Sequence, residues 1–138
     1  MLYLEIITPD GVAWKSGDVE GITLPTRSGE IRILPGHIPL VTIVEAGEVK
    51  ADIGGKTECL AVDRGYARCV SDTVSVLTEA AISVERIDLA SVEEAKARAL
   101  ETLEKYKKTR ETDPEEIERL EATIRFAIAQ QLSKNRKR

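Results

Sequence analysis

Glycine and proline divide this chain into two parts that favour different secondary structures. All nine glycines lie at or before residue 65 of 138, and four of the five prolines lie at or before residue 39. Both residue types supply tight turns, and both destabilise the interior of a helix. The first part therefore favours short strands joined by turns, and the part from residue 86 onward favours helices.

Residues 1–85 show the alternation of apolar and polar positions that is typical of strands. Turn residues such as Pro9-Asp10-Gly11 and Gly54-Gly55 interrupt this alternation, at about the eight-to-twelve-residue spacing of small all-β domains. The pattern predicts an antiparallel β-sandwich or barrel. The predicted strands are 2–8, 12–15, 19–24, 30–34, 40–44, 48–53, 57–62, 66–70 and 74–79.

Residues 86–138 place apolar side chains three and four residues apart, which indicates amphipathic helices. Either Ser91 with Glu94 or, alternatively, Asp88 can cap the first helix, and Asp113 before Pro114 marks the start of the second. The short connection predicts antiparallel neighbours. The apolar side of the second helix is predicted to consist of Ile117, Leu120, Ile124, Ala127, Ile128 and Leu132.

The predicted fold class is therefore α+β. An N-terminal antiparallel β-sandwich or barrel, residues 1–85, is followed by a C-terminal antiparallel two-helix hairpin, residues 86–138. A hairpin of this size has little stability of its own. The hairpin is expected to pack against the sandwich, against a partner, or against each in turn.

Charge also differs between the two parts. Residues 1–85 carry 7 basic and 13 acidic side chains, whereas residues 86–138 carry 13 basic and 11 acidic ones. The basic side of the hairpin is either a solvated face or a surface offered to an acidic protein groove. Nucleic acid is not an expected partner, because acidic residues interleave with the basic ones and aromatic side chains are scarce.

The segment 28–40 differs from the other turns. Pro35 and Pro39, with Gly36 between them, predict a stiff loop that cannot continue a central strand. It carries His37, the single histidine of the chain, so a metal centre built on several histidines is excluded. His37 is expected either to bond backbone groups of its own loop or to contact a partner.

The cysteines and the hydropathy pattern indicate the cellular compartment in which the chain is expected. Cys59 and Cys69 fall in what are predicted to be neighbouring strands, and they are expected to be reduced thiols. Apolar runs are too short to cross a bilayer, and no leader is recognisable at the N-terminus. A cytosolic or peripheral protein without a metal is therefore expected.

Two stretches of the chain resemble the epsilon subunit of the bacterial proton-translocating ATP synthase. They are GEIRILPGHIPLVT at residues 29–42 and VDRGYARCV at residues 62–70, the latter followed by VSVLTEAAI at residues 74–82. The resemblance extends over the whole chain, hairpin included. The chain departs from the family at Arg32, where members often have a small residue, and at Arg64, where they often have a glycine.

The resemblance implies a non-catalytic rotor subunit, peripheral to the cytoplasmic face of the cell membrane. Its sandwich would bind the gamma subunit and rest on the ring of c subunits, with Glu30, Arg32 and His37 as candidate c-ring contacts. Its hairpin would extend into the catalytic alpha/beta head and inhibit ATP hydrolysis there. The candidate inhibitory contacts are Arg119, Arg125, Lys134 and Arg136.

Some family members bind ATP through a motif of isoleucine or leucine, aspartate, two variable residues, arginine and alanine. Here Ile87-Asp88 matches, but Ser91 stands in place of the arginine, so no nucleotide cofactor is predicted.

Two functions of other classes stay open. A small hydrolase would need His37 together with a nucleophile such as Ser28, Ser71 or Cys69, and the sequence shows no ordered triad. A free-standing adaptor with a detachable helical hairpin is the stronger alternative.

Overall fold

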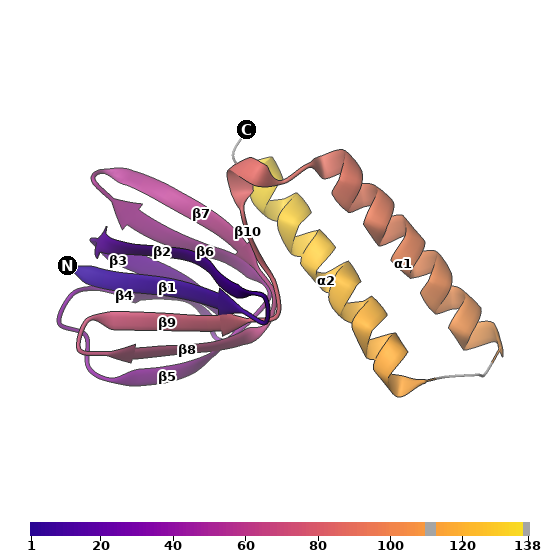
Figure 1. The fold of residues 1–138 in the computed structure, drawn as a ribbon, viewed down its shortest axis with the longest axis horizontal. Helices are drawn as coiled ribbons and strands as arrows, with labels where there is room; N and C mark the ends of the chain where they lie inside the picture. Colours follow the sequence, from indigo (N-terminus) through magenta and orange to yellow (C-terminus); the bar gives the residue numbers. More distant parts are fainter. Residues whose placement is uncertain (110–112, 137–138) are drawn as a thin grey trace.

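A computed structural model describes residues 1–109 and 113–136, apart from the side chains of Thr109 and Arg136. A strand-rich body is followed by two long helices that lie together at one end of it (Figure 1). The strands are β1 Leu2–Thr8, β2 Gly11–Val19, β3 Gly21–Thr26, β4 Gly29–Ile33, β5 Leu40–Val44, β6 Gly47–Ile53, β7 Lys56–Val62, β8 Gly65–Val70, β9 Thr73–Thr78 and β10 Ala81–Ser83.

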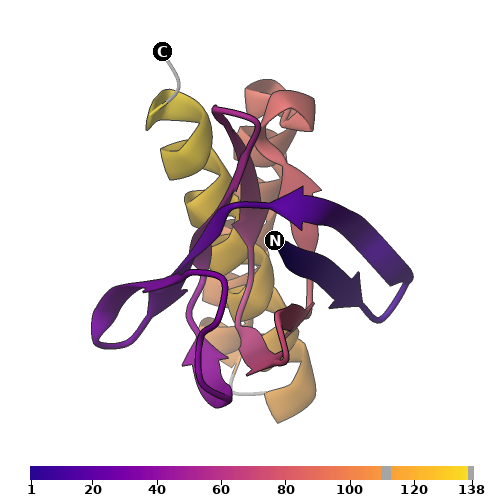
Figure 2. The ribbon, with the colours of Figure 1, turned by 90° about the vertical axis from the view of Figure 1, so that its left-hand side faces the viewer.

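The strands form two five-stranded sheets that pack face to face, as Figure 2 shows from the end of the body away from the helices. We call them the first sheet, with the order β2-β1-β9-β8-β5, and the second sheet, with the order β10-β7-β6-β3-β4. This arrangement confirms the predicted sandwich. The sheets are not wholly antiparallel, however, because β1 pairs with β9 in parallel. Local turn patterns cannot reveal a pairing between strands this far apart in the sequence.

The core lies between the sheets and is built by alternation along each strand. In β1, for example, Leu2, Leu4 and Ile6 are fully buried, and the residues between them face outward. Other members of this core are Val19, Ile22, Leu24, Ile33, Val44, Val49, Leu60, Val62, Val74 and Val76. Because all of them belong to strands, the sandwich has a core of its own without the helices.

All but one of the predicted strands lie within two residues of the observed bounds, and the larger differences are at β2 and β10. Strand β2 continues to Val19 instead of ending at residue 15, since pairing with β1 carries it through a polar stretch that includes Gly17. Strand β10 was not predicted, because three residues are too few to show a period. It is held by pairing with β7 at the edge of the second sheet.

The helices begin at capping aspartates. Helix α1, Leu89–Thr109, starts after Asp88, whose carboxylate accepts bonds from Ala90 N at 3.0 Å and from the Ser91 hydroxyl at 3.1 Å. Of the two alternatives, Asp88 is thus the cap. Helix α2, Pro114–Arg136, starts after Asp113, which accepts a bond from Glu115 N at 3.0 Å. Both aspartates satisfy backbone N–H groups that the first helical turn leaves free.

The hairpin rests on the sandwich mainly through α2. Helix α2 contacts β6 and β7 of the second sheet, whereas α1 packs mainly against α2. A second apolar cluster seals this junction; it contains Cys59, Ala61, Val84, Ile87, Val92 and Ala127. Small residues such as Ala127 and Ala129 let α2 approach closely, and part of the predicted apolar side, Ile128 and Leu132, stays exposed.

Both cysteines are buried, and neither forms a disulfide. They lie in consecutive strands, but β7 and β8 belong to opposite sheets, so the prediction that they occupy neighbouring strands is wrong in space. Burial raises the pKa of the Cys69 thiol. Neither helix, over the residues described, is long and apolar enough to cross a membrane.

Candidate functional site

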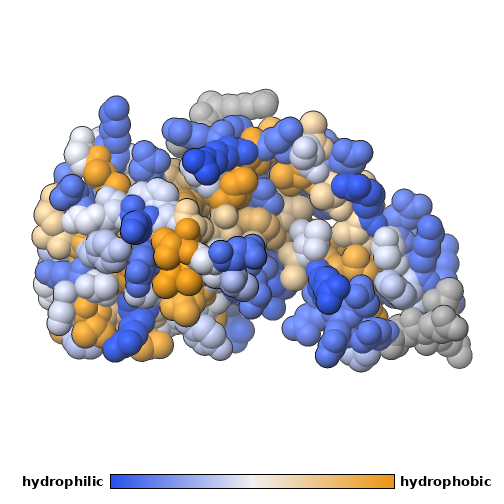
Figure 3. All heavy atoms as spheres, in the orientation of Figure 1, coloured by the Kyte–Doolittle hydropathy of each residue, from blue (hydrophilic) through white to orange (hydrophobic). Residues whose placement is uncertain are grey.

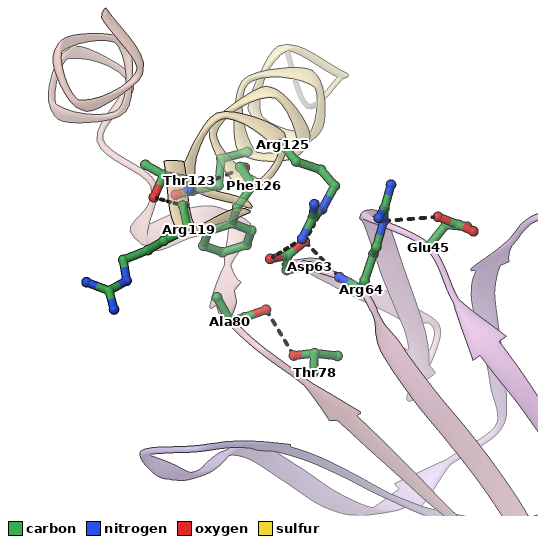
Figure 4. Close-up of polar contacts among 10 residues, drawn as sticks. Glu45, Asp63, Arg64, Thr78, Ala80, Arg119, Thr123, Arg125 and Phe126 are labelled. Atoms are coloured by element: carbon green, nitrogen blue, oxygen red, sulfur yellow. Dashed lines mark hydrogen bonds and ion pairs between the residues drawn. The ribbon is translucent and has the colours of Figure 1, made fainter. Parts of the chain in front are cut away.

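An ion pair holds α2 to the corner between β7 and β8. Arg125 Nε lies 2.6 Å from Asp63 Oδ1, and Arg125 Nη2 lies 3.2 Å from Asp63 Oδ2 (Figure 4). The Asp63 side chain is 3% exposed and that of Arg125 24% exposed. Asp63 Oδ1 also accepts a bond from Arg64 N at 2.8 Å. A bidentate pair of this kind is both strong and directional, and we refer to it as the latch.

The other predicted inhibitory residues differ in their surroundings. Lys134 donates a bond to the Val84 carbonyl oxygen at 3.2 Å, so it too is engaged at the junction with the sandwich. Arg119 points into solvent, with its side chain 73% exposed and bonded at 3.1 Å to Glu116 on its own helix. The side chain of Arg136 lies outside the described residues. In the docked hairpin, Arg125 and Lys134 are therefore bonded at the junction with the sandwich, and Arg119 stays accessible.

The loop with His37 lies at the end of the sandwich away from the helices. Gly36, with a φ of 83°, donates its N–H to Asp72 Oδ1 at 2.7 Å, which ties this loop to the β8–β9 turn. His37 Nδ1 donates to the Ile38 carbonyl oxygen at 2.7 Å. Leu34 and Ile38 beside it are exposed. The loop is thus fixed by its backbone and presents apolar side chains and one imidazole to solvent.

Arg32 lies on the outward face of β4 and bridges three strands. Its Nη2 lies 2.6 Å from Asp52 Oδ2 of β6, and its Nη1 donates to Thr23 Oγ1 of β3 at 3.2 Å. Gly21 leaves room for it, because a Cβ there would lie 2.5 Å from Arg32 Nη2. Hydrogen bonding to Arg32 holds the pKa of Asp52 below its ordinary value of 3.8. Arg32 therefore bonds to neighbouring strands of its own sheet.

Replacing Arg32 with methionine is expected to raise the pKa of Asp52 toward 3.8. A carboxylate with a lowered pKa stabilises the folded state above its unfolded pKa, and this stability is lost as the pH falls through the folded value. The variant should therefore be less stable than the parent at pH 7, by about 0.5–1 kcal/mol for a half-exposed pair. The difference should decrease as the pH falls below 3.8 and disappear below the lowered pKa of Asp52. NMR titration of Asp52 and urea unfolding measure both effects. Arg68→Met, an exposed arginine of the first sheet, is the control, and an equal loss in both variants would contradict this role.

The structure does not bring the three predicted c-ring residues together. Glu30 lies at the start of β4, where it pairs with Lys50 at 3.7 Å and lines a cavity beneath the hairpin. His37 lies past the opposite end of the same strand. Arg32 sits between them, bonded to Asp52. Strand alternation places Glu30 and Arg32 on the side of the second sheet that faces α2. Arg32, one residue before the end of β4, lies toward the far end, as His37 does, whereas Glu30 lies at the end next to the hairpin.

A row of apolar side chains on the first sheet was missed as a site by the sequence prediction. Ile43, Tyr66 and Leu77 are paired across β5, β8 and β9, and all three are exposed. Val41, two residues before Ile43, is 71% exposed. We call these four residues the apolar face. The run LVTIV of β5 offered the one sequence sign, since both sides of that strand are largely apolar.

The described residues contain no group of three or more His, Cys, Asp or Glu side chains that could hold a metal ion. The arrangement instead consists of a fixed loop, an apolar face and a latched hairpin. These are features of a protein that binds other proteins.

Comparison with known proteins agrees with this picture. The family model "ATP synthase, Delta/Epsilon chain, beta-sandwich domain" matches residues 1–84. The ATP synthase epsilon chain of Anoxybacillus flavithermus is 40% identical over 98 residues, which are 71% of this chain and 72% of that relative. The chain belongs to the ATP synthase epsilon family. Epsilon chains are non-catalytic subunits, so both the resemblance and the prediction of a non-catalytic protein are confirmed.

Further epsilon relatives cover the hairpin as well. The epsilon chain of Bacillus velezensis is 35% identical over 125 residues, which are 91% of this chain and 90% of that relative. A chain in the cryo-EM structure of the Euglena gracilis mitochondrial ATP synthase, OSCP/F1/c-ring, matches 96% of this chain and 80% of its own length. The TM-score is 0.72 at 22% identity, which shows a shared fold.

Proposed function

We propose that this epsilon subunit belongs to the central stalk of the proton-translocating ATP synthase. There its sandwich joins the gamma subunit to the c-ring, at the cytoplasmic face of the membrane. The observation that carries the proposal is the apolar face, because Val41, Ile43, Tyr66 and Leu77 lie exposed on one sheet. A contiguous apolar surface rimmed by polar residues is typical of a protein interface. The helices pack mainly on the other sheet; the start of α2 borders Ile43 and Tyr66, but all four side chains stay exposed to gamma.

The far-end loop supports the contact with the c-ring. Its backbone is held by the Gly36–Asp72 bond, and Ile38 and His37 extend from it. A rigid loop can engage the polar loops of a partner without paying for its own ordering. Of the three candidates, His37 fits this contact best. Glu30 and Arg32 can contact the c-ring only if the c-ring also reaches the outer side of the second sheet, which faces α2.

The hairpin supports the proposed regulation. Its docking depends on a narrow junction through α2 and on the latch, so an extended state differs from the docked one by a limited set of contacts. Extension would release the cations Arg125 and Lys134 and carry Arg119 with them toward an acidic surface of the alpha/beta head. We propose that the extended hairpin inhibits ATP hydrolysis in this way.

Leu77→Asp tests the gamma contact. Leu77 lies on β9, inside the first sheet, and a charge there is expected to weaken binding to gamma about 30-fold, the usual effect at the centre of an interface. Surface-immobilised gamma and the purified chain provide the measurement. Leu132→Asp introduces the same charge on the exposed side of α2 and should leave the affinity unchanged. If the parent chain does not bind gamma, the result would favour the alternative function, a free-standing adaptor.

A further inference from the structure

The outward side of the first sheet carries an arginine that has no partner. Among the described residues, the strands β1, β9, β8 and β5 carry two charged side chains, Glu5 and Arg68. Glu5 is half-buried and accepts a bond from the Ser75 hydroxyl at 2.7 Å. Arg68 is exposed, and its guanidinium forms no hydrogen bond or ion pair with any residue that the structure describes. Its donors are therefore available to a partner.

Strand pairing places Arg68 among apolar neighbours. Arg68 lies opposite Val41 of β5 on one side and opposite Ser75 of β9 on the other. Along β8, Tyr66 comes two residues before it and Val70 two residues after it, and both are exposed. Alternate residues of a strand lie on the same side of the sheet, about 7 Å apart. Apolar side chains therefore border Arg68 on three sides.

A partner that covers the apolar face must also cover Arg68. Val41 is paired directly with Arg68, and Tyr66 lies in the next row of the sheet, between Ile43 and Leu77. Figure 3 shows such an alternation on one side of the molecule, where apolar patches of the strand-rich body lie between polar side chains. Covering the guanidinium removes water from it, which costs free energy unless the partner supplies an acceptor of opposite charge.

We propose that the gamma subunit places an aspartate or glutamate opposite Arg68, within an otherwise apolar docking surface. This inference rests on the proposed binding of gamma to the apolar face. The planar N–H donors of a guanidinium match the two oxygens of a carboxylate. Arginine is also enriched at the centres of protein interfaces, where it pairs with groups of the partner. The ion pair fixes the register of gamma on the sheet, which apolar contacts alone do not specify.

Arg68→Met tests the proposal, because methionine keeps an extended side chain and removes the charge. If gamma carries the carboxylate, the substitution leaves it buried and unpaired, and binding to immobilised gamma should weaken about 30-fold. If gamma is apolar at this point, methionine adds apolar contact, and binding should be equal or tighter. Equal or tighter binding by a variant that melts as the parent does would overturn the carboxylate. If the parent itself does not bind gamma, the proposed function fails together with this inference.

Arg98→Met is the matched control, since it removes the same charge from an exposed position of α1 and should bind gamma as the parent does. A double-mutant cycle then identifies the partner residue. Each Asp and Glu of gamma is changed in turn to Asn or Gln, and one change should weaken binding of the parent but not weaken binding of Arg68→Met any further. The absence of such a position would reject the ion pair. A dimer of the purified chain that Arg68→Glu dissociates would assign the carboxylate to a second copy, contrary to the proposal.

Discussion

Asp63→Asn is expected to lower the rate of ATP hydrolysis by the assembled enzyme, whereas Arg125→Met is expected to leave it near the parent rate. Both changes break the latch, and both therefore favour the extended hairpin. They differ in what the extended hairpin still carries. Asp63→Asn leaves every basic side chain in place, and Arg125→Met removes one of the candidate inhibitory contacts. A fall with Asp63→Asn and no fall with Arg125→Met, two partners of one ion pair, would separate the latch from the inhibitory contact.

The sizes of the two effects follow from burial. Asp63→Asn leaves Arg125 about a quarter exposed, so its charge can reach water, and the loss is about 2 kcal/mol. That loss shifts the ratio of docked to extended hairpin about 30-fold. Arg125→Met leaves a buried carboxylate unpaired, which costs about 3–5 kcal/mol. Steady-state hydrolysis of the reconstituted enzyme should fall about fivefold with Asp63→Asn when the docked hairpin outnumbers the extended one about sixfold in the parent.

Removal of residues 88–138 gives the reference for this experiment. The core of the sandwich consists of strand residues alone, so the truncated chain should assemble and set the uninhibited rate. ATP synthesis should stay close to that of the parent. If the truncated and the parent enzymes hydrolyse ATP equally fast, the hairpin of this member does not inhibit. If Asp63→Asn instead accelerates hydrolysis, the latch holds the inhibited state, contrary to the proposal.

Gly65→Ala is expected to lower the free energy of unfolding by at least about 3 kcal/mol, more than a usual overpacking substitution. Gly65 begins β8 and pairs with Val44 on one side and Thr78 on the other. A Cβ at this position would lie 2.9 Å from Thr78 Cα and closer still to the carbonyl oxygen of Leu77. Backbone atoms cannot avoid the contact by changing rotamer as a side chain can, so β8 and β9 would have to separate.

Urea unfolding measures this loss, and Gly17→Ala is the matched control. Gly17 is also in a strand, but the nearest atom to its Cβ position is Tyr3 Cδ2 at 3.7 Å, an ordinary contact. The control should unfold within about 1 kcal/mol of the parent. Because β8 and β9 carry Tyr66 and Leu77, binding to gamma should weaken together with stability in Gly65→Ala. A stable Gly65→Ala chain would show that this strand pair is less constrained than the geometry indicates.

The sequence was sufficient to predict the turns and helix starts that depend only on neighbouring residues. Gly54-Gly55 turns β6 into β7, both with a positive φ, and Asp113 before Pro114 starts α2, as predicted. The choice between Asp88 and Ser91 as cap could not be made from sequence, because both have the right chemistry within one helical turn. In the folded chain the Asp88 carboxylate accepts the bonds of the first turn.

Features that depend on distant residues could not be predicted. The latch joins positions 62 residues apart, and nothing in either neighbourhood marks Asp63 as the partner of Arg125. Helical periodicity identified Ile128 and Leu132 as apolar but could not show that the sheet is too small to cover them. For the same reason Glu30, Arg32 and His37 were grouped by their closeness in sequence, although an extended strand separates its two ends by about 3.3 Å per residue.

The positions of the two ends of the sandwich have a consequence for how this subunit can evolve. The His37 loop lies past one end of the strands, and the Asp63 corner that holds α2 lies at the other end (Figure 1). A substitution near the corner can change how readily the hairpin detaches while leaving the opposite end untouched. Under the proposed inhibition, the strength of regulation and the fit to the c-ring are therefore set at opposite ends of the sandwich, so that each can change without the other.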